Sequence, residues 1–249
     1  MTPRDLPRDG RSRRGEVPGR GLTAGRGLIP TLVVLSASLA TIALAWPRLI
    51  SGVAEAPFQE IVLASPSAVP SSEGVVRRTI AAKEKAVSVS GSGRTWADIG
   101  MLRLREATQA GLASPEGRVA LDASIEAHRR ALALEPSQAF VLTRLAQGIL
   151  MRDGPGDPLV PVILAAAIEA APYDSNLVVA RVNIALAAWD FLQPGLQAAV
   201  QKQIHIAADQ APTGLAEAAA RWFAFQRILV TLGDDPRLLK RFAFAYIRL

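Results

Sequence analysis

The most constraining feature of this chain is a stretch of 20 residues, Gly27 to Trp46, that contains no charged side chain. Nine of these residues are Leu, Ile or Val, so a helix over the stretch is apolar on every face. At about 1.5 Å per residue the helix is roughly 30 Å long, which matches the hydrocarbon thickness of a bilayer. The stretch therefore predicts a single transmembrane helix over residues 27–47.

The charges on either side of this stretch predict its orientation. Residues 1–26 carry seven arginines and three acidic residues, whereas residues 49–76 contain no Lys or Arg. Positive charge accumulates on the cytoplasmic side of a span, so we expect a cytoplasmic N-terminus and a C-terminal domain on the far side. The Ala-, Arg- and Pro-rich composition is typical of a bacterium of high genomic GC content. We therefore expect the bacterial inner membrane, with the C-terminal domain in the periplasm.

A cleaved signal peptide is the alternative to an anchor, because Ala43-x-Ala45 has the form of a small-residue cleavage site. The apolar stretch is longer than the apolar core of about 7–15 residues in most signal peptides, and the basic tail before it is also long. Trp46 and Pro47 would follow the cut. These features favour the anchor.

The positive charge of the chain is mostly a topology signal. The formal net charge is +6, and residues 1–48 hold eight arginines and three acidic residues, a balance of +5. The remaining residues hold 20 basic and 19 acidic side chains, so no basic surface for nucleic acid is expected there. The chain has no cysteine, which excludes disulfides and Cys-ligated zinc.

Composition divides the chain into four parts. Residues 1–26 are rich in Gly, Pro and Arg and predict a disordered cytoplasmic tail, followed by the span at 27–47. Residues 48–93 predict a stalk or linker, within which GVVRRTIAAKEKAV is compatible with a short amphipathic helix. Residues 94–249 show almost continuous helical periodicity, which predicts an all-α domain.

Three prolines divide this domain at regular intervals. Pro136, Pro172 and Pro212 each end an apolar helical run, and they are 36 and 40 residues apart. Proline ends helices because it lacks an N–H donor and restricts the residue before it. An alanine stands five residues before each proline, where a small side chain lets paired helices approach closely. The spacing predicts repeated helix–turn–helix units, and an irregular helical bundle is the alternative.

Two of these units carry a recognisable motif, and a third carries part of it. The first unit reads Trp96-x2-Ile99-Gly100, then Ser124-x3-His128-x2-Ala131-x4-Pro136. The second reads Leu142-x2-Leu145-Ala146-x2-Ile149, then Leu164-x2-Ala167-x4-Pro172, and the third opens near Val178 and closes Ile204-x2-Ala207-x4-Pro212.

Over residues 94–232 the chain resembles the tetratricopeptide repeat family. It departs from the family at Arg103, where an aromatic residue belongs, and by about 12 extra residues around AGLASPEGR. The resemblance implies an irregular array of helix hairpins with a groove for a protein partner.

A final helix is expected to close this array. Asp235-Pro236 has the form of an N-cap followed by proline at the first helical position. The helix that follows places Leu238, Leu239, Phe242, Ala245 and Tyr246 on one face. The prediction is a capping helix. Contact with a membrane or partner is the alternative, because its other face is basic.

No motif for catalysis or metal binding is present. The only two histidines, His128 and His205, have no companion at metal-ligand spacing, and His128 is expected to pack inside a hairpin. No nucleophile elbow or phosphate loop occurs, and Asp153-Gly-Pro-Gly-Asp157 is typical of a turn between helices. We therefore predict no enzyme activity, no cofactor and no metal site, and an enzyme with unrecognised residues is the least favoured alternative.

Two aromatic residues are the predicted contacts for a partner, Trp189 and Phe223. Trp222, Phe225 and Leu229 share a helical face and are expected in the core, whereas Phe223 points elsewhere. Exposed aromatic side chains are effective anchors in protein interfaces.

The predicted function is that of a membrane-anchored periplasmic scaffold or adaptor that binds a protein partner. The segments 171–189 and 195–204 are loosely similar to helical proteins associated with bacterial exopolysaccharide and O-antigen assembly. This similarity implies a role in polysaccharide assembly or export. A periplasmic carbohydrate- or peptide-binding module is the alternative.

Overall fold

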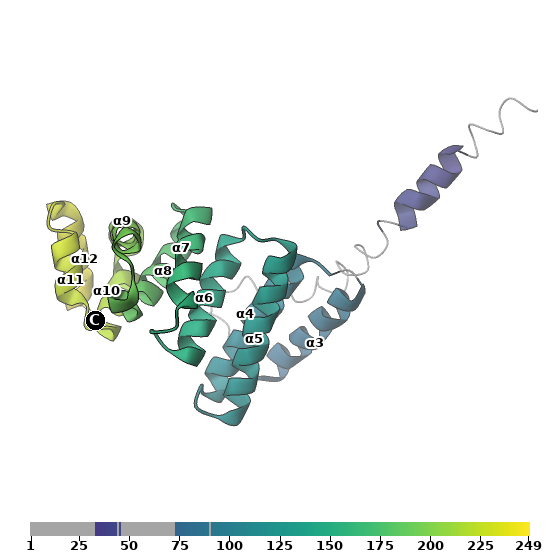
Figure 1. Cartoon of the computed structure of the whole chain (residues 1–249), viewed down its shortest axis with the longest axis horizontal. Helices are drawn as coiled ribbons and strands as arrows, with labels where there is room; N and C mark the ends of the chain where they lie inside the picture. Colours follow the sequence, from purple (N-terminus) through teal and green to yellow (C-terminus); the bar gives the residue numbers. More distant parts are fainter. Residues whose placement is uncertain (1–32, 44, 46–72, 90) are drawn as a thin grey trace, which may run out of the picture. The chain divides into compact units, whose positions relative to one another are not determined.

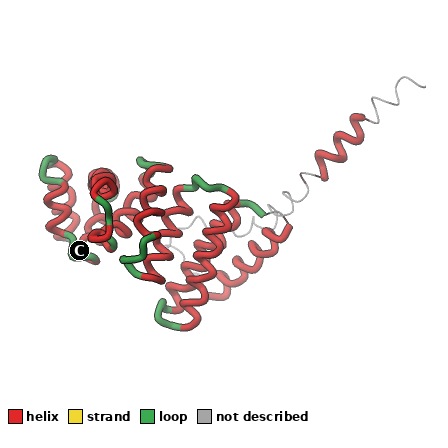
Figure 2. Tube along the Cα trace, in the orientation of Figure 1, coloured by secondary structure: helices red, strands yellow, loops and turns green. Residues whose placement is uncertain are grey.

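The computed structural model describes residues 33–43, 45, 73–89 and 91–249, and most of these residues are helical. No strand occurs among these residues, so the predicted all-α class is confirmed (Figure 2). After the helix at residues 33–43, the elements are α3 (Glu73–Val89), α4 (Gly93–Ala110), α5 (Pro115–Leu134), α6 (Ala139–Asp153), α7 (Leu159–Ala170), α8 (Ser175–Ala187), the 3-10 helix η2 (Trp189–Phe191), α9 (Pro194–Gln210), α10 (Pro212–Arg221), α11 (Phe225–Thr231) and α12 (Pro236–Ile247) (Figure 1).

The helix at residues 33–43 lies within the predicted transmembrane span and belongs to a separate unit from α3–α12. Its large apolar side chains are exposed, namely Val33, Val34, Leu35, Leu39 and Ile42. Across the described part of the chain, no helix combines the length and the hydropathy that a membrane crossing requires. The basic tail, the two ends of the span and residues 48–72 lie outside the described residues.

Residues 73–89 fall within the linker expected at 48–93, but they form α3, which packs against α4. Val76 and Ile80 of α3 make a buried cluster with Leu102 of α4. The Nζ atom of Lys83 is buried and lies 2.9 Å from Oδ2 of Asp98. The apolar residues of α3 recur at helical spacing, so this segment gains a buried face by joining the helical domain.

Successive helices form antiparallel pairs, because the connections between them are short. The pairs are α4 with α5, α6 with α7 and α8 with α9 (Figure 1). Contacts also link α4 to α6, α6 to α8 and α8 to α10 in one layer, and α7 to α9 and α9 to α12 in the other. The result is a two-layered stack in which each pair packs on the next.

The predicted helix breaks coincide with the three prolines. Helix α5 ends at Leu134 and α7 at Ala170, each two residues before a proline, and α10 begins at Pro212. The alanines that precede these prolines have no exposed surface, at positions Ala131, Ala167 and Ala207. The extra residues of the first unit lengthen α4 and α5, and only residues 111–114 connect these two helices.

Helix α12 has the cap and the buried face predicted for it. Oδ1 of Asp235 accepts hydrogen bonds from the backbone N–H groups of Arg237 and Leu238 at 3.0 and 3.1 Å. Leu238, Phe242 and Ala245 are buried. The rings of Phe225, Phe242 and Tyr246 pack together with centroids 4.5 to 5.9 Å apart. The end of α12 therefore adds an aromatic cluster to the core.

Candidate partner-binding surface

Phe223 occupies a helix-terminating position that usually requires glycine. Helix α10 ends at Arg221, and the N–H of Ala224 donates to the carbonyl of Ala219 at 2.9 Å, while the N–H of Phe223 donates to that of Ala220. This pair of bonds is the Schellman arrangement, in which the residue after the cap is left-handed. Phe223 has a φ of +51°, which costs a residue with a Cβ about 1–2 kcal/mol.

The phenyl ring of Phe223 gains nothing from burial that offsets this strain. Its side chain is 96% exposed, and it is the most exposed of the large hydrophobic residues that the structure describes. A glycine in its place satisfies the same backbone geometry without strain. Strained backbone at an exposed aromatic residue is often associated with a functional role. Whether Phe223 binds a partner stays a prediction.

Trp222, expected in the core, is 40% exposed. The reason is the break between α10 and α11, which removes it from the helical face of Phe225 and Leu229. Both of those residues do pack against the core. The Nε1–H of Trp222 donates to Oδ1 of Asn183 on α8 at 2.6 Å. This bond fixes the indole against α8 and leaves part of the ring accessible.

Trp189, the other predicted contact residue, is half-buried in η2 and packs against the core. The guanidinium of Arg227 on α11 lies over its ring, with Cζ 4.7 Å from the ring centroid. Arg227 also lies 3.9 Å from the carboxylate of Asp190. Trp189 is therefore partly covered, and access to its face requires Arg227 to move.

Two contacts hold the turn that carries Phe223. Trp222 precedes Phe223 and bonds to α8, and Arg227 follows it and stacks on Trp189. We refer to Trp189, Trp222 and Phe223 as the aromatic surface. The structure thus brings the two predicted residues onto adjoining elements, with Phe223 the more accessible of them.

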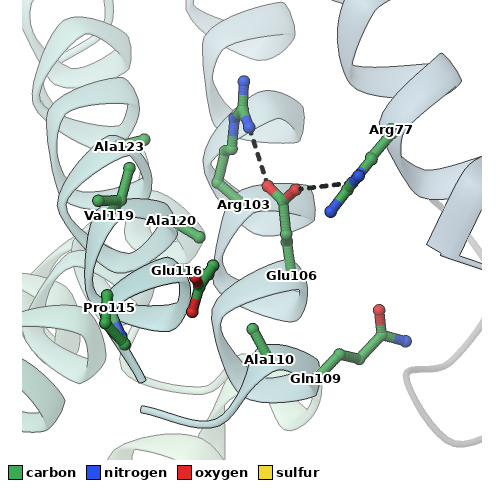
Figure 3. A pocket seen from close by; sticks show the side chains of 10 residues that line it. All are labelled: Arg77, Arg103, Glu106, Gln109, Ala110, Pro115, Glu116, Val119, Ala120 and Ala123. Atoms are coloured by element: carbon green, nitrogen blue, oxygen red, sulfur yellow. Dashed lines mark hydrogen bonds and ion pairs between the residues drawn. The ribbon is translucent and has the colours of Figure 1, made fainter. Parts of the chain in front are cut away.

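A separate hollow of about 760 Å³ lies between α3, α4 and α5 (Figure 3). Its wall on α5 is formed by small or apolar side chains and one carboxylate, Glu116, whereas α3 and α4 contribute mainly charged and amide groups (Figure 3). The residues that line it are Arg77, Arg103, Glu106, Gln109, Ala110, Pro115, Glu116, Val119, Ala120 and Ala123. Among these lining residues there is no aromatic ring on which a sugar would stack.

Ion pairs organise the polar side of this hollow. Arg103 donates from Nη1 to Oε2 of Glu106 and from Nη2 to Oε1 of Glu84, both at 2.8 Å. Arg77 of α3 approaches Glu106 from the other side, with Nε 3.7 Å from Oε1 (Figure 3). Burial disfavours the charge on Arg103, but the two carboxylates outweigh it and raise its pKa above the ordinary value.

His128 packs inside the first hairpin, as its position in the motif predicts, and is fully buried. The Ser124 hydroxyl donates to the carbonyl of Gly100 at 2.7 Å, so His128 Nδ1, 3.4 Å away, is the donor to Ser124. Nε2 is then unprotonated and faces Gly100, where a Cβ would lie only 2.7 Å from it. Burial, aided by the charge of Arg144, lowers the pKa of His128 to about 4.

Arg181 is fully buried and has no carboxylate hydrogen-bonded to it among the described residues. Its Nη1 donates to the carbonyl of Ala171 at 2.7 Å, and its Nε lies 3.4 Å from Oγ1 of Thr143. Ala171 caps the C-terminus of α7, so the guanidinium lies at the negative end of that helix. Burial lowers the pKa of Arg181, and the charge of Asp174 opposes that shift.

Gln203 of α9 completes this buried contact. Its Oε1 lies 3.5 Å from Nη1 of Arg181, and its Nε2 donates to the carbonyl of Pro172 at 2.6 Å. One guanidinium therefore connects α6, the end of α7, α8 and α9. The arrangement is a structural clamp rather than a reaction site, because every group it contacts is a neutral hydrogen-bond acceptor.

The described residues include no cluster of three or more His, Asp or Glu side chains suited to a metal ion. The imidazole Nδ1 of His205 lies 2.9 Å from the carbonyl of Gln201 in its own helix. Asp157 lies in the turn between α6 and α7, where its Oδ1 accepts the N–H of Leu159 at 2.8 Å. Neither residue is part of an acid–base pair.

Comparison with models of protein families, with curated proteins and with solved structures gives no match.

Proposed function

We propose that this protein is a membrane-anchored scaffold or adaptor that holds a protein partner through its aromatic surface. The observation that carries the proposal is Phe223, whose ring is 96% exposed on a backbone in the left-handed conformation. Packing does not explain a phenylalanine there, whereas an interface rich in aromatic anchors does. Trp222, next to it in the chain, extends the apolar contact area, and Trp189 does so once Arg227 moves from its ring.

Membrane anchoring forms the second part of the proposal. The helix at residues 33–43 carries exposed apolar side chains, and its hydroxyl groups are satisfied internally. Ser36, Ser38 and Thr41 each donate to a backbone carbonyl three or four residues earlier, at 3.0, 2.8 and 2.8 Å. Such bonding removes the penalty for polar groups in lipid. A span over residues 27–47 places the tail in the cytoplasm and the helical domain in the periplasm.

The helical domain is proposed to be an irregular array of tetratricopeptide-like hairpins. The pairing of successive helices and the two-layered contacts support this proposal, as do the buried alanines before the three prolines. Arrays of this kind offer an extended binding surface. Assembly or export of a cell-envelope polysaccharide is the proposed context, and the bacterial inner membrane is the proposed location.

Photo-crosslinking of the full-length chain in native membranes tests this proposal. A photoreactive phenylalanine analogue at Phe223 preserves the ring and the backbone geometry, and the same probe at exposed Tyr173 is the matched control. We expect protein adducts from position 223 that position 173 does not give. A polysaccharide polymerase, ligase or exporter among them supports the proposed context. Adducts to lipid alone contradict the scaffold.

Phe223→Gly separates binding from folding. Glycine relieves the left-handed strain but adds freedom to the unfolded chain, so we expect the free energy of unfolding to be unchanged or higher by up to about 1 kcal/mol. Capture of the crosslinked partner by affinity purification is expected to fall at least tenfold. Retained capture by a stable Phe223→Gly protein rules out Phe223 as the anchor.

The hollow between α3, α4 and α5 favours a second candidate function, binding of a peptide. Its volume of about 760 Å³ lies within the range of small-ligand sites. On α5, Val119, Ala120 and Ala123 suit an aliphatic side chain, whereas Glu116 and the charged groups of α3 and α4 suit polar backbone groups. If peptides from a library stabilise the chain and Ala123→Trp abolishes that stabilisation, this candidate is supported. Stabilisation by glycans alone argues against it.

A further inference from the structure

Helix α12 has a second face that the fold does not use. Its buried face contains Leu238, Phe242 and Ala245, while Lys240, Phe244 and Ile247 lie on the opposite side of the helix. Phe244 is 58% and Ile247 is 84% exposed. Capping the array therefore explains one face of α12 and leaves two large apolar side chains in water on the other.

The same face is strongly basic. Residues 236–249 contain four cationic side chains and no acidic one, the cations being Arg237, Lys240, Arg241 and Arg248. Asp209 of α9 pairs with Arg241 at 2.8 Å and with Arg237 at 3.6 Å. Within the described residues, Lys240 and Arg248 have no carboxylate partner. The surface thus has an excess of positive charge around its two apolar side chains.

Arg248 and Phe244 are arranged as a unit beside a shallow hollow. The guanidinium of Arg248 lies over the phenyl ring, with Cζ 4.1 Å from the centroid. Both residues line a hollow of about 460 Å³ together with Arg241 and with Pro212 and Thr213 of α10. Two guanidinium groups beside an exposed ring suit a ligand that presents phosphate next to hydrocarbon.

We propose that the outward face of α12 docks on an anionic phospholipid surface. Phe244 and Ile247 enter the interfacial layer, and Lys240 and Arg248 lie among the lipid phosphates. Charge complementarity supports an anionic occupant, because the segment has only cations. A helix that carries exposed apolar side chains and cations on one face has the pattern of helices that lie in the interfacial layer of a membrane, so a lipid surface is the better fit.

The absence of cysteine from the chain makes a direct test straightforward. Ile247→Cys carries an environment-sensitive fluorophore in the full-length protein, reconstituted into phosphatidylcholine vesicles with or without phosphatidylglycerol. Quenching by acyl chains that bear nitroxide groups reports entry into the bilayer. The control label is Val162→Cys on α7, a similarly exposed aliphatic position. We expect quenching at 247 that requires phosphatidylglycerol, and none at 162.

Charge reversal isolates the role of the cations. Lys240→Glu with Arg248→Glu leaves the buried face of α12 intact, and Arg118→Glu with Arg129→Glu makes the same charge change on exposed positions of α5. Each cation near an anionic surface contributes about 1 kcal/mol, so the loss of two costs about 2 kcal/mol, and we expect the first pair to weaken the docking reported by the label at 247 about thirtyfold. The second pair is expected to change it by less than twofold.

Several results overturn the proposal. These are equal quenching with and without phosphatidylglycerol, equal quenching at 162 and 247, or no effect of the α12 charge reversal. Shielding of the label only when proteins from a membrane extract are added assigns the face to a protein instead. The inference does not rest on the aromatic surface, and Phe223→Gly is expected to leave lipid docking unchanged.

Discussion

The helical domain buries different side chains in its two regions. From α3 to Gln203 of α9 the core includes polar and charged residues, namely Thr79, Lys83, Thr95, Ser124, His128, Thr143, Arg181 and Gln203. After Gln203, every buried residue is apolar. Among the residues that the structure describes, the most exposed aromatic rings all follow residue 172, at Tyr173, Phe191, Trp222, Phe223 and Phe244.

This contrast separates two ways of specifying a helix stack. Hydrogen bonds between buried groups are directional, so a pair such as Lys83 and Asp98 accepts one register of α3 on α4. The second region relies on shape, through alanines in α10 and the aromatic cluster of α12. We expect substitutions in the polar region to have larger effects than those in the apolar one.

The largest effect is expected at Arg181. Arg181→Ala leaves a cavity and removes the donor to the Ala171 carbonyl, and we expect the free energy of unfolding to fall by about 3–5 kcal/mol in a denaturant titration. Arg181→Met fills most of the space without burying a charge, so its effect is expected to be about half as large or less. A loss below about 1 kcal/mol in Arg181→Ala contradicts the clamp.

The second-largest effect is expected from acid, which lowers the stability of the polar region through His128. The folded state lowers the pKa of His128 from an ordinary value of 6.5 to about 4, so below pH 6.5 the unfolded chain binds more protons. Stability is complete above pH 6.5 and falls as the pH decreases towards 4, by about 3 kcal/mol at pH 4. Unfolding measured across this window tests the prediction. His128→Phe keeps a flat ring against Gly100 and is expected to remove this slope.

Gly100→Ala should break the close approach of α4 to α5. The added Cβ lies 2.7 to 2.8 Å from three ring atoms of His128, and such overpacking costs about 1–3 kcal/mol. Gly195→Ala in α9 is the matched control, because its Cβ meets nothing within 4 Å. In thermal unfolding, Gly100→Ala should lower the midpoint temperature, and Gly195→Ala should leave it unchanged. Equal midpoints contradict the close approach.

The smallest effect is expected in the apolar region, at the N-cap of α12. Asp235→Ala removes the N-cap of α12, and we expect a loss of about 1 kcal/mol in the free energy of unfolding. Asp234→Ala beside it removes the same charge and no hydrogen bond of the cap. If the two variants lose equal stability, charge and not capping is responsible.

The helical organisation was largely predictable from residues whose effects are local. Proline at 136, 172 and 212 ends or begins a helix whatever surrounds it, and Asp235-Pro236 specifies its own cap. The apolar face of α12 follows from spacing alone. The packing of α3 was less predictable, because α3 lies in a segment with the composition of a linker. Its short apolar stripe is buried only through contact with Leu102 of another helix.

The surface was less predictable because it depends on exceptions to local rules. Phe223 takes a backbone position that glycine normally marks, so no sequence signal showed the break that exposes Trp222. The role of Arg181 was not predicted for a different reason. Nothing in LVVARVNIAL indicates that the hydrogen-bond acceptors of this arginine lie on three other elements. The hollow beside α5 arises from the separation of α3 and α5, which no single segment encodes.

The buried guanidinium of Arg181 also affects how the stack opens. Arrays in which each helix contacts only its neighbours lose their ends first and unzip stepwise. Arg181 connects four successive helices through one side chain. Local unfolding that releases α10 to α12 is therefore expected to stop at α9. Amide protons between Ala171 and Gln203 would then exchange with solvent together, as one cooperative unit, while those of the following helices exchange earlier.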